Sequence, residues 1–223
     1  MCTLVVSAQP LIVVANRDES LGRPSRPPFQ WDEGFLAPRD ELAGGTWLGV
    51  NPHGVFVGIT NRYQAMLDAK RASRGELVVR ALGLTSARAI HDAMRAIEPK
   101  AYNGFHLVYA DERDVLATAA DGITLAQFTL GSGVVAITER SFGAGDDSKR
   151  IARIMKRWDR DPAKLSTLLA EHDEEDPLSA TCVHAPSVDY GTRSAMILTR
   201  EHGAWKMSWA DGPPCTTPFR PVP

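Results

Sequence analysis

The residue with the most chemical potential in this sequence is a cysteine directly behind the initiator methionine. Removal of Met1, which is common before a small residue, would leave Cys2 with a free α-amine. That amine has an unperturbed pKa of roughly 7.7–8.0 and a thiol one of about 8.5, so one residue would supply both a nucleophile and a base near neutral pH. The alternative interpretation is a cysteine on a buried strand with no chemical role.

Charged residues follow a second apolar run close to this cysteine in the sequence. Residues 4–6 and 11–15 are short β-type runs with a turn between them, and the second ends in Asn16, Arg17, Asp18 and Glu19. Such a pattern predicts a hairpin, which would bring the end of the second strand close to Cys2. A guanidinium at this point would lower the pKa of the thiol, and a carboxylate would hold the α-amine. The alternative is a solvated strand end with a local ion pair.

A neutral hydrogen-bond donor is the further group that acyl transfer requires, because the oxyanion must be stabilised. Residues 44–51 and 54–61 predict a second strand pair with a turn at 52–54, and Asn61 ends that pair. We expect Asn61 to be such a donor. The alternative is an Asx-type turn before Arg62.

The remaining pattern predicts the elements that must position these residues. We expect an irregular loop over the Pro- and Arg-rich residues 21–39, and a loose tail over 213–223. Phe29, Trp31 and Trp47 would line a ligand cleft near Cys2 or pack in the core. Helices are predicted at 73–82 with Ser73 in a capping box, from Thr85 to before Pro99, and at 148–158 and 161–169. Further strands are predicted at 104–110, 115–120, 123–129, 134–138, 180–184, 194–199 and 204–209.

This order of strands and helix pairs favours an α+β fold, and a four-layer αββα sandwich accommodates all of it in one domain, residues 1–223. A split near Tyr102 is the alternative, but no linker composition supports it. Residues 143–149 superficially resemble a phosphate loop, but they lack its spacing. They are interpreted as the entry to a helix with Ser148 as its cap.

Composition excludes several classes of function. A net charge of −2 argues against a nucleic-acid-binding protein. The longest apolar runs, about five residues, are far shorter than the roughly 20 that span a membrane, and without a signal segment we expect a cytoplasmic protein. Three scattered cysteines predict a reduced compartment without disulfides. Six histidines without ligand spacing predict no metal site.

Seven short motifs in order resemble the NRDE family, also called the transport and Golgi organisation protein 2 family. They are Met1-Cys2, Asn16-Arg17-Asp18-Glu19, Gly45-Thr46-Trp47-Leu48-Gly49, Thr60-Asn61, Ser73-Arg74-Gly75, Tyr102-Asn103-Gly104-Phe105 and Tyr190-Gly191-Thr192-Arg193-Ser194. The resemblance covers nearly the whole chain. It implies the N-terminal nucleophile hydrolase fold, an αββα sandwich, with a distant similarity to the cysteine enzymes that cleave amides such as conjugated bile acids and penicillin V.

The resemblance also implies roles for individual residues. Cys2 is the expected nucleophile, Arg17 and Asp18 support it, Asn61 is the oxyanion donor and Arg193 is the late arginine of the site. Where relatives carry a Ser-Asn-Ala segment, this chain has Ile137-Thr138-Glu139-Arg140, so that asparagine is missing.

Two functions remain open at this point. The first is hydrolysis of a linear amide of a small molecule through a Cys2 thioester, which requires no cofactor. The second is non-catalytic binding or trafficking of haem or an acyl-type lipid in the same pocket, because some family members are discussed as haem-mobilising or lipid-handling factors. The missing asparagine favours the second function.

Overall fold

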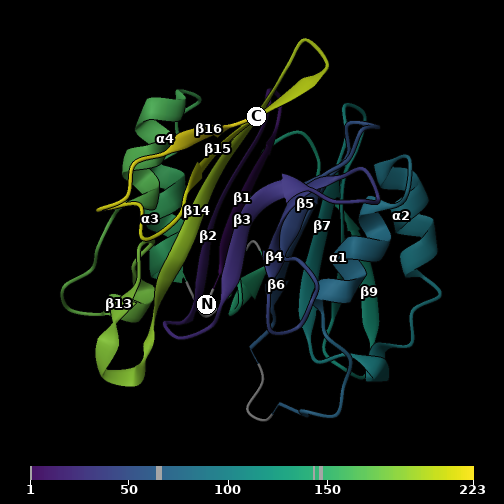
Figure 1. The fold of residues 1–223 in the computed structure, drawn as a ribbon, viewed down its shortest axis with the longest axis horizontal. Coiled ribbons are helices and arrows are strands. Elements are labelled where there is room, and N and C mark those ends of the chain that lie inside the picture. Colours follow the sequence, from purple (N-terminus) through teal and green to yellow (C-terminus); the bar gives the residue numbers. More distant parts are fainter. Residues whose placement is uncertain (1, 64–66, 143, 146–147) are drawn as a thin grey trace. The chain divides into compact units, whose positions relative to one another are not determined.

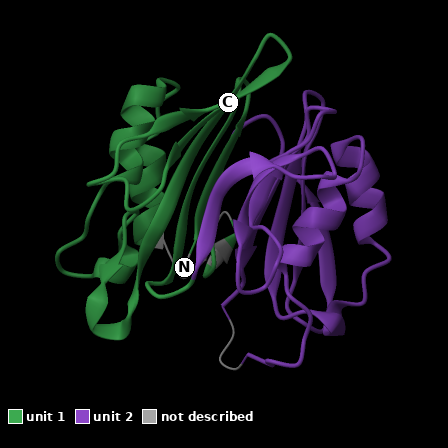
Figure 2. Ribbon diagram, viewed as in Figure 1, with its two compact units in different colours: residues 1–23, 134–223 green, residues 24–133 purple. Residues whose placement is uncertain are grey.

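The computed structural model describes residues 2–63, 67–142, 144–145 and 148–223. The chain divides into two compact units: unit 1 comprises residues 1–23 and 134–223, and unit 2 comprises residues 24–133 (Figure 2). Each unit is a β-sheet with a pair of helices. The prediction of a single domain stays a prediction.

Unit 1 is built on an antiparallel sheet whose central strands come from both ends of the chain (Figure 1). Nine strands are described, and β13 (His184–Ala185) pairs with β14 beside the main path. Along that path the order is β12 (Ala144–Gly145), β11 (Ser141–Phe142), β10 (Val134–Thr138), β1 (Thr3–Ala8), β2 (Leu11–Ser20), β14 (Tyr190–Glu201), β15 (Ala204–Ala210) and β16 (Arg220–Val222).

One face of this sheet is covered by α3 (Ser148–Arg157) and α4 (Pro162–Leu169), as Figure 1 shows at the left. Successive side chains of a strand point to opposite faces, and the inward set packs with the apolar stripe of the helices. The core of unit 1 therefore includes Val5, Ile12, Val14, Ala195, Ile197, Ile154, Leu165 and Leu168. The Asp161 side chain caps α4 and Pro162 follows it, which confirms the predicted helix start. The loop after α4 contains a 3-10 turn, Pro177–Ser179, and a second one, Pro186–Val188, precedes β14.

Unit 2 is an antiparallel meander in chain order. Its seven described strands are β3 (Ser25–Gln30), β4 (Leu36–Asp40), β5 (Leu48–Val50), β6 (Phe56–Asn61), β7 (Phe105–Ala110), β8 (Val115–Ala120) and β9 (Leu125–Thr129). The helices α1 (Gly75–Leu82) and α2 (Ala87–Met94) pack on one face (Figure 1), and a 3-10 turn, Pro99–Ala101, follows them. Leu77 and Ile90 from these helices and Leu107 from β7 are fully buried in the core of unit 2.

Two of the seven ordered motifs meet in a close backbone contact. A Cβ on Gly75 would lie 2.9 Å from the carbonyl oxygen of Thr46, and one on Gly45 would lie 2.8 Å from the carbonyl carbon of Gly75. Only glycine fits here, because real Cβ atoms do not approach a backbone so closely. The helix begins at Gly75, with Arg74 at the N-cap and without a side-chain cap bond. The predicted Ser73 capping box is therefore wrong, and Ser86, not Thr85, caps α2.

Three of the predicted segments differ from the structure. Residues 21–39 contain β3 and β4 instead of an irregular loop, because β3 is an edge strand and its prolines fall at the register shift between Arg26 and Phe29. The predicted strand at 180–184 is reduced to β13, since Cys182 donates its backbone N–H to the Glu171 carbonyl at 2.8 Å instead of to a strand. The tail is not loose either: Arg220–Val222 extends the sheet edge beside β15.

Two other predictions concern the membrane and the segment before α3. In the described part of the chain, every helix is too short or too polar to cross a membrane. Residues 143, 146 and 147 of the predicted helix entry lie outside the described residues, as does the side chain of Ser148.

Candidate functional site

The pairing of β1 with β2 determines where Cys2 lies. Thr3 is opposite Asn16 in the antiparallel register, so Cys2, one residue earlier, lies next to the end of β2. Its Sγ is 4.0 Å from the carbonyl oxygen of Asp18, the distance of a weak sulfur hydrogen bond. The predicted hairpin is confirmed, and Cys2 is half-buried beside the residues it was expected to meet.

The side chain of Asp18 points to the helix-covered face of the sheet. Thr3, Asn16 and Asp18 share this face, and Asn16 donates from Nδ2 to the carbonyl oxygens of Leu169 at 2.9 Å and Thr181 at 2.7 Å. By strand alternation, Arg17 points to the opposite face. Arg17 is 5% exposed and forms an ion pair with Glu19, with 3.8 Å between Nη2 and Oε2. The side chains of Arg17 and Asp18, which are adjacent in the sequence, therefore lie on opposite faces of the sheet.

Asp18 is the centre of a buried polar network. The Thr192 hydroxyl donates to Asp18 Oδ1 at 2.6 Å, and Arg150 Nη1 lies 3.9 Å from Oδ2 with both side chains fully buried. Burial raises the pKa of Asp18 to about 6, although the Arg150 cation and the Thr192 hydrogen bond favour the ionised form. The carboxylate is therefore charged at neutral pH. The Tyr190 hydroxyl donates to the main-chain oxygen of Asp18 at 2.8 Å, the same atom that faces Cys2.

The thiol of Cys2 is harder to ionise than an exposed thiol. Burial raises its pKa, and the Arg17 guanidinium lowers that pKa by a smaller amount. Arg17 lowers the pKa of the thiol, as expected, but desolvation of the thiolate outweighs the attraction of the cation, so the pKa is raised. A base is needed to form the thiolate at neutral pH.

Arg193 is placed at the site by a β-bulge. On β14, Thr192 is opposite Asp18 and Ser194 is opposite Arg17, so Arg193 is the extra residue between them. Bulges re-aim side chains and are frequent next to functional sites. Arg193 is half-buried. The structure thus brings together Cys2, Arg17, Asp18 and Arg193 along three neighbouring strands of unit 1.

Asn61 belongs to unit 2. It is the last residue of β6, pairs with Phe105 on β7 and is half-buried. Its predicted place at the end of a strand is confirmed. Its role as an oxyanion donor stays a prediction.

The segment that departs from the family pattern borders Cys2 on the other side. Thr138, the last residue of β10, is opposite Thr3 and fully buried. Thr138 accepts a hydrogen bond at Oγ1 from the backbone N–H of Arg140 at 3.2 Å. Burial is the main reason that the pKa of Asp18 is raised, and the nearby Glu139 carboxylate raises it by a smaller amount.

Sequence reasoning missed Arg150, Thr192 and Tyr190. Thr192 and Tyr190 belong to the motif that contains Arg193, so a prediction of strand pairing could have placed them close to Asp18. The position of Arg150 could not be predicted in this way, because it resembles part of a solvated basic face. The same helix also carries Lys149, Arg153, Lys156 and Arg157.

Two further groups of residues are suited to holding a ligand. A cleft of about 450 Å³ within unit 2 is lined by Phe29, Trp31, Arg39 and neighbours. Trp31 also belongs to the core of unit 2, against which Phe29 and Trp47 pack. The predicted cleft near Cys2 stays a prediction. In unit 1, His172, Cys182, His184 and Cys215 come together with their ligand atoms within 4.8 Å of one another. The histidines were expected to be ordinary surface or core residues because their spacing in the sequence does not match a metal site. In the folded chain, however, two of them lie together with two cysteines.

Comparison with solved structures identifies the fold. The chain is similar to a Caenorhabditis elegans N-acylethanolamine-hydrolyzing acid amidase ortholog, with a TM-score of 0.62 over 89% of this chain and 92% of that one. It is also similar to penicillin V acylase from Agrobacterium tumefaciens, with a TM-score of 0.50 over 95% and 83% of the two chains. Identity is 12% in both cases, so the likeness shows the fold alone. It confirms the predicted αββα class of the N-terminal nucleophile hydrolase type.

Sequence comparison identifies the family. A transport and Golgi organization protein 2 homolog from Homo sapiens is 36% identical over 110 residues, which are 47% of this chain and 40% of that protein. The Bos taurus homolog is 27% identical over 229 residues, 86% of this chain and 82% of that protein. A family model described as Transport and Golgi organisation 2 matches residues 1–210. The chain therefore belongs to the Transport and Golgi organisation 2 family, as the ordered motifs predict.

Proposed function

We propose that this protein is a cytoplasmic N-terminal cysteine hydrolase that cleaves a linear amide of a small molecule. The observation that carries the proposal is the register of β1 and β2, which sets Cys2 against Asp18 at the end of the neighbouring strand. A fold shared with a protein described as an N-acylethanolamine-hydrolyzing acid amidase and with a penicillin V acylase supports this reaction class. N-acylethanolamines are linear amides.

The reaction requires that Met1 be removed, so that Cys2 carries the α-amine. The amine takes the proton of the thiol, and Sγ attacks the carbonyl carbon of the amide. The tetrahedral intermediate collapses as the C–N bond breaks, and the ammonium returns the proton to the leaving amine. Water, deprotonated by the same amine, then attacks the thioester carbonyl. The C–S bond breaks, the acid is released, and the Cys2 thiolate recovers the proton from the ammonium. Each step conserves protons and requires no cofactor.

The charged residues around Cys2 have distinct tasks in this mechanism. Asp18, ionised at neutral pH, holds the α-amine in place, and Arg150 and Thr192 hold Asp18. Arg17 and Arg193 project from adjacent strands and favour a negatively charged intermediate or substrate group. A backbone N–H stabilises the oxyanion, and the role of Asn61 as its side-chain donor stays a prediction. Because desolvation raises the pKa of the thiol, the α-amine is the base on which turnover depends.

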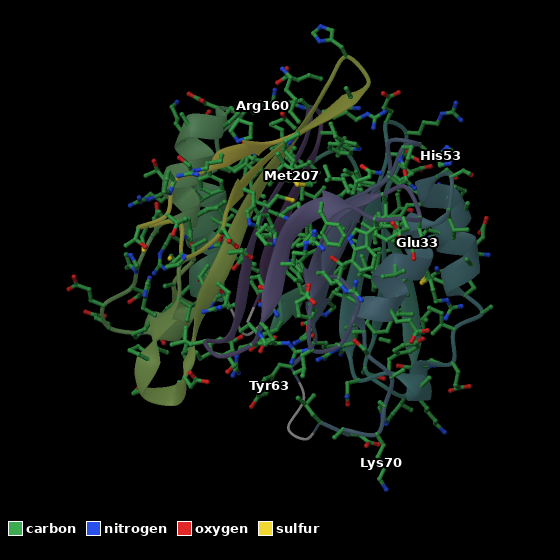
Figure 3. All side chains as sticks on the ribbon, viewed as in Figure 1. Glu33, His53, Tyr63, Lys70, Arg160 and Met207 are labelled. Atoms are coloured by element: carbon green, nitrogen blue, oxygen red, sulfur yellow. The ribbon has the colours of Figure 1, made fainter. Side chains whose placement is uncertain are left out.

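The test combines intact-mass spectrometry with hydrolysis of N-acyl amides of increasing chain length. We expect a chain without Met1 that forms an acyl adduct on Cys2 and releases the amine. Cys2→Ala should lack turnover, and Cys2→Ser should retain the fold with strongly reduced turnover. His53→Ala, at an exposed turn of unit 2 (Figure 3), is the control that should behave like the wild type. Turnover by Cys2→Ala, or by a chain that retains Met1, would disprove the mechanism.

A second function, non-catalytic binding of haem or an acyl-type lipid, is favoured by the cleft in unit 2, in place of the pocket at Cys2 that the sequence predicts for it. Phe29 and Trp31 are stacked there with ring centroids 5.4 Å apart. The Arg39 guanidinium lies 5.3 Å from the Trp31 ring. An aromatic pair beside a cation suits an apolar ligand that carries carboxylates. Absorbance titration with haem should then show a spectral change that Phe29→Ala weakens and Cys2→Ala preserves. An unchanged spectrum at micromolar haem would reject the haem version.

A further inference from the structure

Two cysteines and two histidines from three separate segments of unit 1 converge at one point. His172 follows α4, Cys182 follows the 3-10 turn Pro177–Ser179, His184 begins β13, and Cys215 lies between β15 and β16. His184 Nε2 is 3.2 Å from Cys215 Sγ and 3.5 Å from Cys182 Sγ. The rings of His172 and His184 have centroids 4.8 Å apart.

We propose that these four side chains bind one zinc ion. With Zn–S bonds of about 2.3 Å and Zn–N bonds of about 2.0–2.1 Å, neighbouring ligand atoms of a tetrahedron are roughly 3.3–3.8 Å apart. The two sulfur–nitrogen distances agree with these edges, and all four ligand atoms lie within 4.8 Å of one another. A contraction of less than about 1.5 Å closes the longest edge, which rotation of the exposed imidazoles supplies.

The ligand types select zinc over other common cations. Calcium and magnesium prefer oxygen ligands, whereas a tetrahedral set of two sulfurs and two nitrogens is characteristic of zinc or of iron–sulfur centres. Two thiolates neutralise the charge of Zn²⁺, so a partly buried site with neutral imidazoles carries no net charge. Four protein ligands fill the coordination sphere, which is the pattern of a structural zinc site rather than a catalytic one.

The backbone holds the ligand segments before any ion binds. The N–H of Cys182 donates to the Glu171 carbonyl at 2.8 Å, next to His172 in sequence. Val183, between two ligands, donates to Thr192 Oγ1 at 2.8 Å, and the N–H of Thr192 returns a bond to the Val183 carbonyl at 2.9 Å. Cys215 lies in a turn closed by the N–H of Thr217 on the Pro213 carbonyl at 2.9 Å. Such preorganisation reduces the entropic cost of binding.

The four residues differ in burial, so the site has one buried side and one side open to solvent. Cys182 is fully buried, Cys215 is half-buried, and His172 and His184 are exposed. An ion can therefore enter from solvent on the histidine side. A disulfide between Cys182 and Cys215 is the competing explanation, but it gives no role to the two histidines.

The test is the metal content and zinc affinity of the full-length chain purified under reducing conditions. We expect about one zinc per chain, and absorption of the cobalt-substituted protein with the intense visible bands of a tetrahedral thiolate site. Cys215→Ser and His172→Ala change solvent-accessible positions and should fold. Both should weaken zinc binding, measured against a chromophoric chelator, by more than the roughly 10–100-fold that loss of an outer-shell partner costs.

Two matched controls isolate the site. Cys2→Ser removes the third cysteine of the chain, and His53→Ala removes an exposed histidine of unit 2 (Figure 3); both should retain wild-type zinc content. The proposal is overturned if the reduced chain binds zinc no better than Cys215→Ser does. It is equally overturned if the freshly isolated chain carries a Cys182–Cys215 disulfide instead of metal.

Discussion

Replacement of Arg150 by methionine tests the buried network behind Cys2 most directly. The Arg150 side chain is fully buried, lies 3.9 Å from the Asp18 carboxylate and donates from Nη1 to Thr3 Oγ1 at 3.2 Å. Methionine fills a similar volume without charge, so the variant leaves Asp18 buried without this cation. Breaking a buried pair by removing one partner typically costs about 3–5 kcal/mol. We expect Arg150→Met to lose that much stability at pH 8.

The loss should depend on pH. The folded-state pKa of Asp18, about 6, is above its ordinary value of 3.8, so folding favours the protonated carboxyl. The stability that this group contributes is fully present below pH 3.8 and is lost as the pH rises through 6, by roughly 3 kcal/mol. Without Arg150 the pKa of Asp18 rises further, which adds about 1.4 kcal/mol per unit at pH 8. At pH 5 the carboxyl is already neutral, and the variant should lose only hydrogen bonds, about 1–3 kcal/mol.

The assay is urea denaturation of wild type and variant at pH 5 and pH 8, followed by circular dichroism. Arg153→Met, on the same helix, is the control: Arg153 is 23% exposed and pairs with Asp173 near the surface, so its loss should cost about 0–1 kcal/mol at either pH. Adding Asp18→Asn to Arg150→Met should recover part of the stability at pH 8. An equal loss at both pH values, or a larger one at pH 5, would refute the reasoning.

Three predictions concern the core of unit 2, each measured as a shift in denaturation midpoint. Gly75→Ala should cost about 1–3 kcal/mol, because its Cβ would lie 2.9 Å from the Thr46 carbonyl oxygen; Gly133→Ala, in open space, should stay within about 0.5 kcal/mol, and equal effects would contradict the close contact. Tyr109→Phe should cost about 1–3 kcal/mol, because the hydroxyl lies 2.8 Å from both a buried histidine nitrogen and a threonine oxygen. Asn51→Ala should cost about 2–4 kcal/mol, since this amide bonds two carbonyls at the end of α1 and two turn N–H groups; a neutral result in either case would mean that water replaces the lost partner.

The elements that sequence predicts correctly are those whose pattern is local. The hairpin of residues 1–19 follows from two apolar runs and a turn, and the start of α4 follows from the Asp161-Pro162 pair. The predicted loop at 21–39 failed because proline is compatible with a strand that has one unpaired edge. Whether a strand is at an edge depends on the topology of the sheet, which local composition does not contain.

The candidate site shows the same limit. Cys2, Arg17 and Asp18 are predictable because they belong to one hairpin, and Arg193 because its motif is specific. Arg150 becomes part of the site only when α3 packs on the sheet and its guanidinium reaches Thr3 and Asp18. The His172, Cys182, His184 and Cys215 cluster is hidden for the same reason, because its ligands are spread over more than 40 residues of the sequence.

Thr192 joins the two sites of unit 1 into one hydrogen-bonded structure. Its hydroxyl donates to Asp18 Oδ1 at 2.6 Å and accepts the Val183 N–H at 2.8 Å. Val183 lies between Cys182 and His184 in the sequence. The proposed zinc ligands are therefore linked to the Asp18 carboxylate through the backbone of Val183 and the hydroxyl of Thr192. A bound ion would restrain this segment and with it the orientation of the Thr192 hydroxyl. Since that hydrogen bond favours ionised Asp18, removal of zinc is expected to raise the pKa of Asp18 and, in the proposed mechanism, to weaken its interaction with the amine of Cys2.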